Sequence, residues 1–279
     1  MEVKKGMIAA TVVTRNRLEL LKQVITGLRT QTHKLDCIII VNNASDDGTA
    51  EWLASQTDLL VFTQENVGGA GGHCRGSQEA YNAGYEWIWQ MDDDVVPTPN
   101  CLEELLKYAT EDFVPTPLRI AVDGNVFYKH DTLEVNLTNP FKSIWRKVFT
   151  EADMADVIYA DGVTLEGPLF HRSMYDKVGF VVSDFFIYAD DTEFCIRLMK
   201  AGIRKGIIRN AVLQRLLPIP ADEHIFDWKT YYTIHNLITI DRLHCNWLVR
   251  TLRPLGYCIK WLCRCKSLKD VCVVLRAFK

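Results

Sequence analysis

Three adjacent aspartates, Asp92, Asp93 and Asp94, directly follow the apolar run 87–91. Carboxylates this close repel one another unless a cation or hydrogen-bond donors offset their charge. Hard oxygen ligands of this kind suit Mg²⁺ or Mn²⁺ better than zinc. The triplet therefore predicts a divalent cation site, although a charged turn that caps the helix expected after Pro97 would use the same residue types.

A second acidic group, Asp190, Asp191 and Glu193, follows the aromatic run 185–188 at a predicted helix start. Carboxylates in this position are stabilised by the helix dipole and the free amides, so a helix cap is one interpretation. The other is a general base, in which one carboxylate anchors an acceptor hydroxyl while its neighbour takes the proton during attack.

Two loops have the composition of a site for a polar or anionic ligand. Segment 42–49 leaves a predicted strand and enters a helix with side chains that can cap the helix or bind a ligand. The glycine-rich run 68–72, followed by Arg75, offers bare backbone N–H groups at a helix start. Cys74 stands where a dinucleotide fingerprint needs a glycine, and no P-loop sequence is present. These features favour a nucleotide or sugar-nucleotide pocket with a metal over hydride transfer or P-loop hydrolysis.

The elements that must position these residues alternate along the first hundred positions. Predicted strands cover 7–14, 37–41, 59–63 and 87–91, and predicted helices cover 18–28, 49–54 and about 70–85. This alternation predicts βαβ units and a parallel sheet covered on both faces. Right-handed crossovers then place the loops that carry the chemistry on one edge, at the carboxyl ends of the strands.

The second half of the chain is less regular. We expect a helix near 102–108, a strand over 157–159, and helices over 174–178 and 191–201. From Asp227 a helical pattern runs to about Val249, and a basic amphipathic segment follows Pro254. That segment suits the headgroup layer of an anionic membrane, and a helix pair packed on the domain is the alternative.

Composition sets further bounds. The 279 residues are 48% hydrophobic and 24% charged, which fits one large domain or a domain with an appendage. A net charge of -3 gives no reason to expect nucleic acid, although nine Lys or Arg and a single acid, Asp270, lie from Arg242 onward. Nine cysteines without paired spacing predict reduced thiols and a cytoplasmic location. We expect no signal peptide and no membrane span, because no apolar stretch reaches about 20 residues.

Over about residues 7–215, the order and spacing of five motifs resemble the inverting family 2 glycosyltransferases with the GT-A fold. The motifs are Thr11-Val-Val-Thr-Arg-Asn-Arg, Val41-Asn-Asn-Ala-Ser-Asp-Asp-Gly-Thr, Asn66-Val-Gly-Gly-Ala-Gly-Gly, Met91-Asp-Asp-Asp and Asp190-Asp-Thr-Glu-Phe. The glycine run and the Trp-Gln-Met-Asp-Asp-Asp strand are similar to the branch that contains bacterial galactofuranosyltransferases and rhamnosyltransferases of surface-polysaccharide assembly. The resemblance implies an α/β GT-A fold, with a mixed, mostly parallel sheet flanked by helices and a C-terminal helical extension.

The resemblance also implies roles for individual residues. It assigns the nucleobase and ribose to Thr14, Arg15, Asn43 and Asp46, and the diphosphate and donor sugar to Asn66, Gly69 and Arg75. It assigns the ribose or metal to Asp92, and a Mn²⁺ or Mg²⁺ ion bridging the diphosphate to Asp93 and Asp94. It makes Asp191 the base, with Asp190 as the second choice. It divides the chain into a GT-A domain at 1–226, with a nucleotide-binding half at 1–96 and an acceptor half at 97–226, and a basic helical extension at 227–279.

Two positions depart from the family pattern. Gln214 occupies the region in which relatives often have a metal-binding histidine, and His224 is the nearest later imidazole, so either could complete the metal site. His235 replaces the arginine of a Tyr-x-x-Arg-Asn pattern.

The implied function is inverting, metal-dependent transfer of galactofuranose or rhamnose from a UDP- or dTDP-sugar. The acceptor would be a lipid-linked or oligosaccharide glycan in O-antigen or capsule synthesis, with peripheral contact at the inner face of the cytoplasmic membrane. One alternative is a sugar nucleotidyltransferase, although the segment 14–17 lacks the glycine-rich basic loop expected of that class. Another is a catalytically silent sugar-nucleotide-binding module, against which Asp191 argues.

Overall fold

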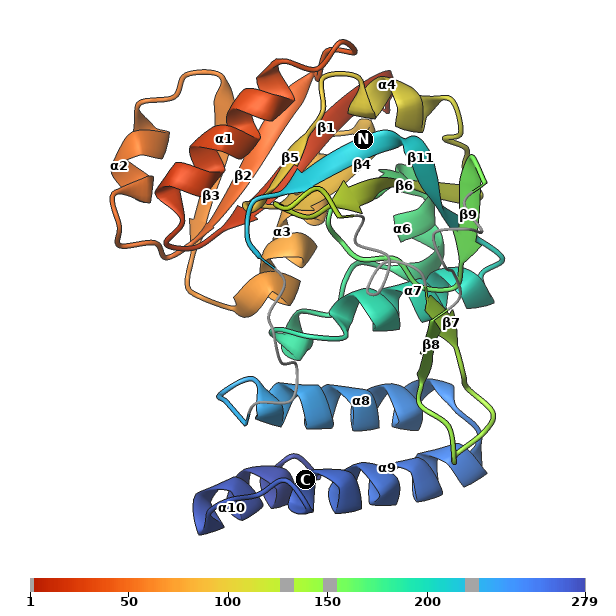
Figure 1. Cartoon of the computed structure of the whole chain (residues 1–279). Coiled ribbons are helices and arrows are strands. Elements are labelled where there is room, and N and C mark those ends of the chain that lie inside the picture. The colour runs from red at the N-terminus through yellow and green to blue at the C-terminus, as the bar shows by residue number, and fades with distance from the viewer. Residues whose placement is uncertain (1–2, 126–132, 148–154, 219–225, 279) are drawn as a thin grey trace.

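A five-stranded sheet forms the centre of the computed structural model, which describes residues 3–125, 133–147, 155–218 and 226–278 (Figure 1). The strand order is β10-β4-β1-β2-β3. These strands are β1 (Lys4–Thr14), β2 (Cys37–Asn43), β3 (Leu59–Gln64), β4 (Tyr85–Asp92) and β10 (Leu169–His171). The first four pair in parallel and β10 pairs antiparallel with β4, which confirms the predicted βαβ arrangement.

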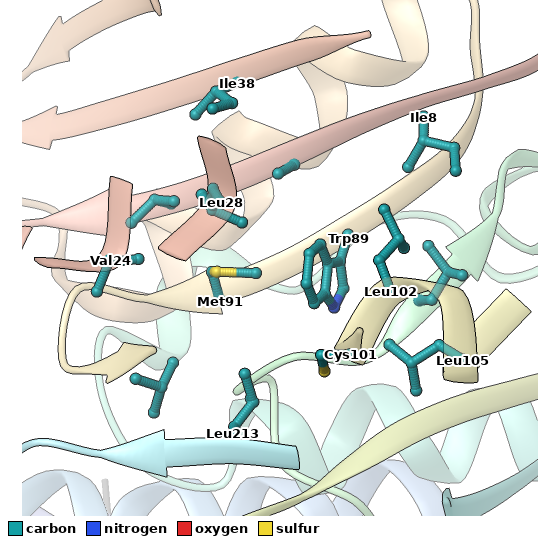
Figure 2. Close-up of a cluster of buried hydrophobic side chains, with 14 of the residues drawn as sticks. Ile8, Val24, Leu28, Ile38, Trp89, Met91, Cys101, Leu102, Leu105 and Leu213 are labelled. Carbon is teal, nitrogen blue, oxygen red and sulfur yellow. The ribbon is translucent and has the colours of Figure 1, made fainter. Parts of the chain in front are cut away.

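Helices cover both faces of this sheet because successive strand residues point to opposite sides. Ile8, Ala10 and Val12 of β1 pack with α1 (Leu18–Arg29) and α4 (Cys101–Leu106) in one core cluster (Figure 2). Ala9 belongs to a second cluster on the other face. The helices of that face are α3 (Gly68–Asn82), α6 (Arg172–Val178) and α7 (Asp190–Lys200). The short α2 (Thr49–Ala54) connects β2 to β3.

A second sheet adjoins the acidic triplet. It consists of β5 (Val95–Pro97), β6 (Phe113–Ile120), β9 (Val157–Ala160) and β11 (Arg204–Arg215). Strand β11 pairs with β6 in parallel and with β5 and β9 in antiparallel fashion. The pairing of Arg215 with Val95 places this arginine directly beside the turn that holds the aspartates. A small hairpin, β7 (Leu133–Val135) and β8 (Trp145–Lys147), completes the strands.

Three helices close the chain: α8 (Thr230–His244), α9 (Trp247–Leu262) and α10 (Leu268–Arg276). In Figure 1, α8 lies next to α7, and α9 lies on the far side of α8. The expected division of this tail, with a break between Val249 and the residues after Pro254, is wrong. The break falls at 245–246, where the Asn246 side chain accepts a hydrogen bond from the backbone of Val249 and caps α9.

Pro254 lies buried inside α9, so tertiary packing overrides its helix-breaking tendency. In the described part of the chain no helix is both long and apolar enough to cross a membrane. All nine cysteines are free thiols, as predicted.

Candidate nucleotide-sugar site

A cavity of about 530 Å³ opens at the carboxyl ends of β1, β2 and β4. The start of α3, the loop before β10 and the start of α7 supply its other walls. The predicted site residues that line it are Thr14, Arg15, Asn43, Asn66, Gly69, Asp92, Asp93, Asp190 and Asp191. The cavity therefore lies on the sheet edge at which open α/β sheets bind ligands.

Asp93 is held by protein donors. Its Oδ2 accepts hydrogen bonds from Thr14 Oγ1 at 2.8 Å and from the backbone N–H of Arg15 at 3.3 Å. Its Oδ1 accepts one from Arg17 Nη1 at 2.9 Å. With these bonds Asp93 fixes the loop after β1, which carries Thr14 and Arg15 to the cavity.

Asp92 and His73 form a pair that the sequence did not predict. The imidazole of His73, on α3, is buried and its Nε2 lies 3.0 Å from Asp92 Oδ1. Burial alone would raise the pKa of Asp92, but the hydrogen bond and charge of His73 outweigh it and lower the pKa. Burial would likewise lower the pKa of His73, and Asp92 reverses that effect. Asp92 therefore stays an anion that faces the cavity.

Asp92, Asp94 and Glu166 together have the geometry of a cation site. Each offers a carboxylate oxygen, and the three oxygens lie within 4.8 Å of one another. The pKa of Asp94 is raised to about 7. Burial is the largest cause, and the negative charges of Asp92 and Glu166 add to it. Asp94 Oδ1 is buried and has no hydrogen-bond partner among the described residues. Three hard oxygen donors suit Mg²⁺ or Mn²⁺.

Three arginines partly offset this acidic cluster. Arg17 Nη1 lies 3.1 Å from Asp94 Oδ2, and Arg215 Nη1 lies 3.2 Å from Glu166 Oε1. Arg119 forms a further ion pair with Glu166. The four carboxylates Asp92, Asp93, Asp94 and Glu166 thus face three arginines and His73, whose pKa is raised, so the protein itself offsets much of their charge.

The glycine run serves mainly to bring α3 close to its neighbours. A Cβ on Gly72 would lie 2.2 Å from Val13 Cγ1 of β1, and one on Gly68 would lie 2.0 Å from the carbonyl oxygen of Phe186. A Cβ on Gly69, by contrast, would meet no atom within 4 Å. Gly69 is therefore the position of the run at which a ligand can approach the backbone within the cavity.

The loop before α7 sets the position of the predicted base. Asp190 and Asp191 are half-buried in the first turn of α7, and Asp191 Oδ1 accepts hydrogen bonds from Thr192 N at 2.6 Å and Thr192 Oγ1 at 3.2 Å. The pKa of Asp191 is raised to about 7, with burial as the largest cause and the negative charge of Asp190 as the second. Neither aspartate caps α7, because its N-cap residue is Ala189 and no side-chain cap bond is present there.

Aromatic side chains form the rim near this base. Phe186 and Trp228 both line the cavity, with their rings 6.5 Å apart and nearly perpendicular. Tyr232 of α8 stacks on Phe186 at 4.9 Å. Trp228 is 61% exposed, which leaves an uncovered aromatic surface at the same cavity as Asp191.

Some predicted residues lie elsewhere. Asp46 is exposed and accepts a hydrogen bond from Asn16, and Arg75 pairs with Glu79 at 2.6 Å and covers the Phe62 ring. Neither Asp46 nor Arg75 lines the cavity.

His235 stacks on Tyr231, with its Nδ1 3.1 Å from the carbonyl oxygen of Ala277. Gln214 is exposed on β11, and His224 lies outside the described residues. The predicted metal pair Asp93 and Asp94 stays a prediction, since the carboxylate group found here joins Asp94 to Asp92 and Glu166.

Solved structures with the same fold define the class of protein. GalNAc-T7, crystallised with UDP, GalNAc and Mn²⁺, superposes with a TM-score of 0.66 at 12% identity, over 85% of this chain and 48% of that one. The chain thus spans about half of GalNAc-T7. Residues 1–349 of TarS from S. aureus, in complex with UDP, give a TM-score of 0.56 at 13% identity, over 90% of this chain and 68% of that one. The fold is the GT-A glycosyltransferase fold, as the motifs predicted.

Sequence comparison identifies the family within that class. The profile described as glycosyl transferase family 2 matches residues 10–178, and the chain belongs to this family. The galactofuranosyltransferase GlfT1 of Mycolicibacterium smegmatis is 27% identical over 239 residues, covering 78% of this chain and 72% of the relative. GlfT1 of Mycobacterium tuberculosis H37Rv is 27% identical over 231 residues, covering 77% and 71%. The predicted glycosyltransferase activity and the resemblance to galactofuranosyltransferases are confirmed.

Proposed function

We propose that this glycosyltransferase moves galactofuranose, with rhamnose as the second choice, from a UDP- or dTDP-sugar to a glycan acceptor with inversion at the transferred carbon. One observation supports the proposal. A single cavity is lined by the predicted nucleotide contacts Thr14, Arg15 and Asn43, by Asp92 and Glu166 of the three-carboxylate cluster, and by Asp190 and Asp191, while Asp94, the third member of that cluster, is not among the lining residues. The galactofuranosyltransferases among its relatives favour that sugar. The UDP-bound structures of the same fold favour UDP as the nucleotide.

The donor would lie along the carboxyl edge of the sheet. Thr14, Arg15 and Asn43 would contact the nucleoside, and Asn66 and Gly69 would border the diphosphate and the sugar. Arg75 and Asp46 are weaker candidates for donor contacts because their side chains pair outside the cavity. Arg17 is a better-placed cation for the diphosphate, since it lines the cavity and lies next to Asp93.

Asp92, Asp94 and Glu166 would hold the divalent cation. When bound, Mn²⁺ or Mg²⁺ supplies positive charge that stabilises the diphosphate as a leaving group. The residues that position this site are His73, which orients Asp92, and Arg215, which contacts both Asp94 and Glu166.

Asp191 would act as the general base. The acceptor hydroxyl oxygen attacks the anomeric carbon, its proton passes to the Asp191 carboxylate, and the bond from that carbon to the diphosphate breaks with its electron pair leaving on the diphosphate. One base and direct attack give inversion without a protein nucleophile. A pKa of about 7 suits a base that works near neutral pH.

The acceptor would enter past Phe186 and Trp228, and we propose a lipid-linked or oligosaccharide glycan of bacterial surface-polysaccharide synthesis. The division at 226–227 and the location at the inner membrane face remain predictions.

The test is transfer from a panel of radiolabelled UDP-, dTDP- and GDP-sugars to membrane-derived and synthetic glycan acceptors, with NMR assignment of the new linkage. Asp191→Asn should lower kcat by about 10³-fold or more, consistent with loss of general-base catalysis and its coupled steps. The matched variant Asp184→Asn, which changes an exposed carboxylate outside the cavity, should retain activity.

The panel also separates the alternatives. Release of pyrophosphate from a nucleoside triphosphate and a sugar phosphate would support a nucleotidyltransferase. UDP binding without turnover of any donor would support a silent binding module, and retention of configuration would exclude direct attack assisted by Asp191.

A further inference from the structure

The carboxamide of Asn236, on α8, is buried, and its NH₂ group, which has two N–H donors, lies within hydrogen-bond distance of three carbonyl oxygens of the loop before Asp190. Its Nδ2 lies 2.9 Å from the carbonyl oxygen of Phe185, 3.0 Å from that of Ile187 and 2.7 Å from that of Tyr188. A single side chain from the C-terminal helices thus contacts three carbonyl groups of the loop that precedes Asp190 and Asp191.

The backbone of this loop needs an external partner. Phe186, Tyr188 and Ala189 have φ angles of 59°, 77° and 65°, in the left-handed region that side chains other than glycine disfavour. Such conformations persist only where surrounding contacts hold them, and they concentrate at functional sites. Removal of the carboxamide would take a side-chain donor away from these carbonyl groups, although that of Phe185 would keep its hydrogen bond from Ile187 N at 2.6 Å.

The same bend determines where the base lies. It ends at Ala189, the N-cap of α7, so any relaxation of residues 186–189 moves the first turn of α7 and with it Asp190 and Asp191. It also carries Phe186, whose carbonyl oxygen accepts a hydrogen bond from Ala70 N at 3.2 Å and faces Gly68 on the donor side of the cavity. The loop therefore joins the base to the start of α3.

We propose that Asn236 is a positioning residue that locks loop 186–189, with its three left-handed residues, and so holds Asp191 where it can take the proton of the acceptor hydroxyl, which makes α8 an integral part of the active site. This inference rests on the proposed function insofar as it concerns Asp191. The other part of the inference, that the carboxamide of Asn236 fixes loop 186–189, does not depend on which reaction takes place in the cavity.

The test compares Asn236→Ala with Ile238→Ala in the full chain. Ile238 is fully buried in the cluster formed by α8, α9 and α10, so its truncation also weakens the packing of α8 without touching the loop. Asn236→Ala should lower kcat about 10²-fold, the loss expected when a reacting group moves by about 1 Å, with little change in the KM for donor. Ile238→Ala should keep kcat within about threefold of the wild type.

Two further measurements do not depend on identifying the substrates. Hydrogen exchange of the backbone amides of residues 185–191 should accelerate in Asn236→Ala and stay unchanged in Ile238→Ala. The affinity for UDP in the presence of Mn²⁺ should be alike in both variants. Asn236→Asp, which puts an acceptor against three carbonyl oxygens, should be at least as impaired as Asn236→Ala.

The outcomes separate the two proposals. Equal exchange in all proteins, or equal loss of kcat in Asn236→Ala and Ile238→Ala, would overturn the role of Asn236. Faster exchange at 185–191 in Asn236→Ala, with no sugar transfer by the wild type, would support the loop lock and count against the proposed function instead.

Discussion

Neutralising Asp190 should move the acid limb of the pH–rate profile to lower pH. Asp191 has a pKa of about 7, some three units above the ~3.9 of a free aspartate, which corresponds to ~4 kcal/mol against ionisation. Burial is the largest cause and the charge of Asp190 the second. We therefore expect Asp190→Asn to lower the pKa of Asp191 toward that of a free aspartate, by about one unit.

The assay is kcat/KM between pH 5 and pH 9, because this ratio reports the ionisation of the free enzyme. A base must be deprotonated, so activity should rise through pH 7 in the wild type and through about pH 6 in Asp190→Asn. At pH 6 the ionised fraction of Asp191 would increase from about one tenth in the wild type to about one half in Asp190→Asn. The kcat/KM at pH 6, expressed as a fraction of each protein's own high-pH plateau, should therefore be about fivefold higher in the variant. Asp184→Asn serves as the control for the loss of a carboxylate. A limb that stays near pH 7 in Asp190→Asn, or shifts equally in Asp184→Asn, would refute the electrostatic coupling.

The same ionisation predicts a change in stability. Because the pKa of Asp191 is raised in the folded protein, its contribution favours folding fully below about pH 4 and is lost as the pH rises through 7. Asp190→Asn should therefore increase the free energy of unfolding at pH 8 by ~1 kcal/mol or more, as measured by urea denaturation. A decrease at pH 8 would show that Asp190 makes a stabilising contact that outweighs the repulsion.

Two predictions concern the metal and the membrane. Glu166→Gln should weaken Mn²⁺ binding by roughly tenfold or more, as measured by EPR of the free ion with UDP present. Glu134→Gln on β7, which does not line this cavity, should leave Mn²⁺ binding unchanged. Equal affinities would remove Glu166 from the cation site. Leu255 and Ile259 are 55% and 64% exposed, and their four-residue spacing puts them on one side of α9 in the basic tail. Changing both Leu255 and Ile259 to Gln should lower partition onto phosphatidylglycerol vesicles by about 10²-fold, because each buried aliphatic side chain contributes ~1.5–3 kcal/mol. The control Leu60→Gln on β3, which changes another exposed leucine, should leave the partition unchanged. A wild-type chain that stays in the supernatant would show that α9 does not bind membranes.

The sheet edge and its loops could be predicted because they depend on local pattern. Apolar runs of strand length, followed by polar turns and helical periods, specify βαβ units, and the handedness of the crossovers then puts every loop on one edge. Thr14, Asn43, Asp92 and Asp191 therefore line one cavity, although nearly 180 positions separate the first from the last.

The position of Arg75 outside the cavity has a geometric cause that the helix period could have indicated. Gly69 and His73 are four residues apart and share one face of α3, whereas Arg75 is six residues from Gly69 and points to another. The helix thus presents His73 to Asp92 and sends Arg75 to Glu79.

The sequence by itself determined the alternation of strands and helices over the first hundred residues, the edge on which ligand-binding loops gather, and the two acidic motifs, because these follow from short-range periodicity and chain handedness. Only the tertiary structure decided which distant groups complete the site. Glu166 and Arg215 lie in segments with no motif of their own, and Asn236 ends the Tyr-x-x-Arg-Asn pattern, which by itself did not indicate a contact with the base loop. The pairing of β5 with β11 brings Arg215 to the site, and the packing of α8 on the base loop brings Asn236 there. Charge balance around the aspartates and support for a left-handed loop are properties of neighbours in space, so no local pattern of residues encodes them.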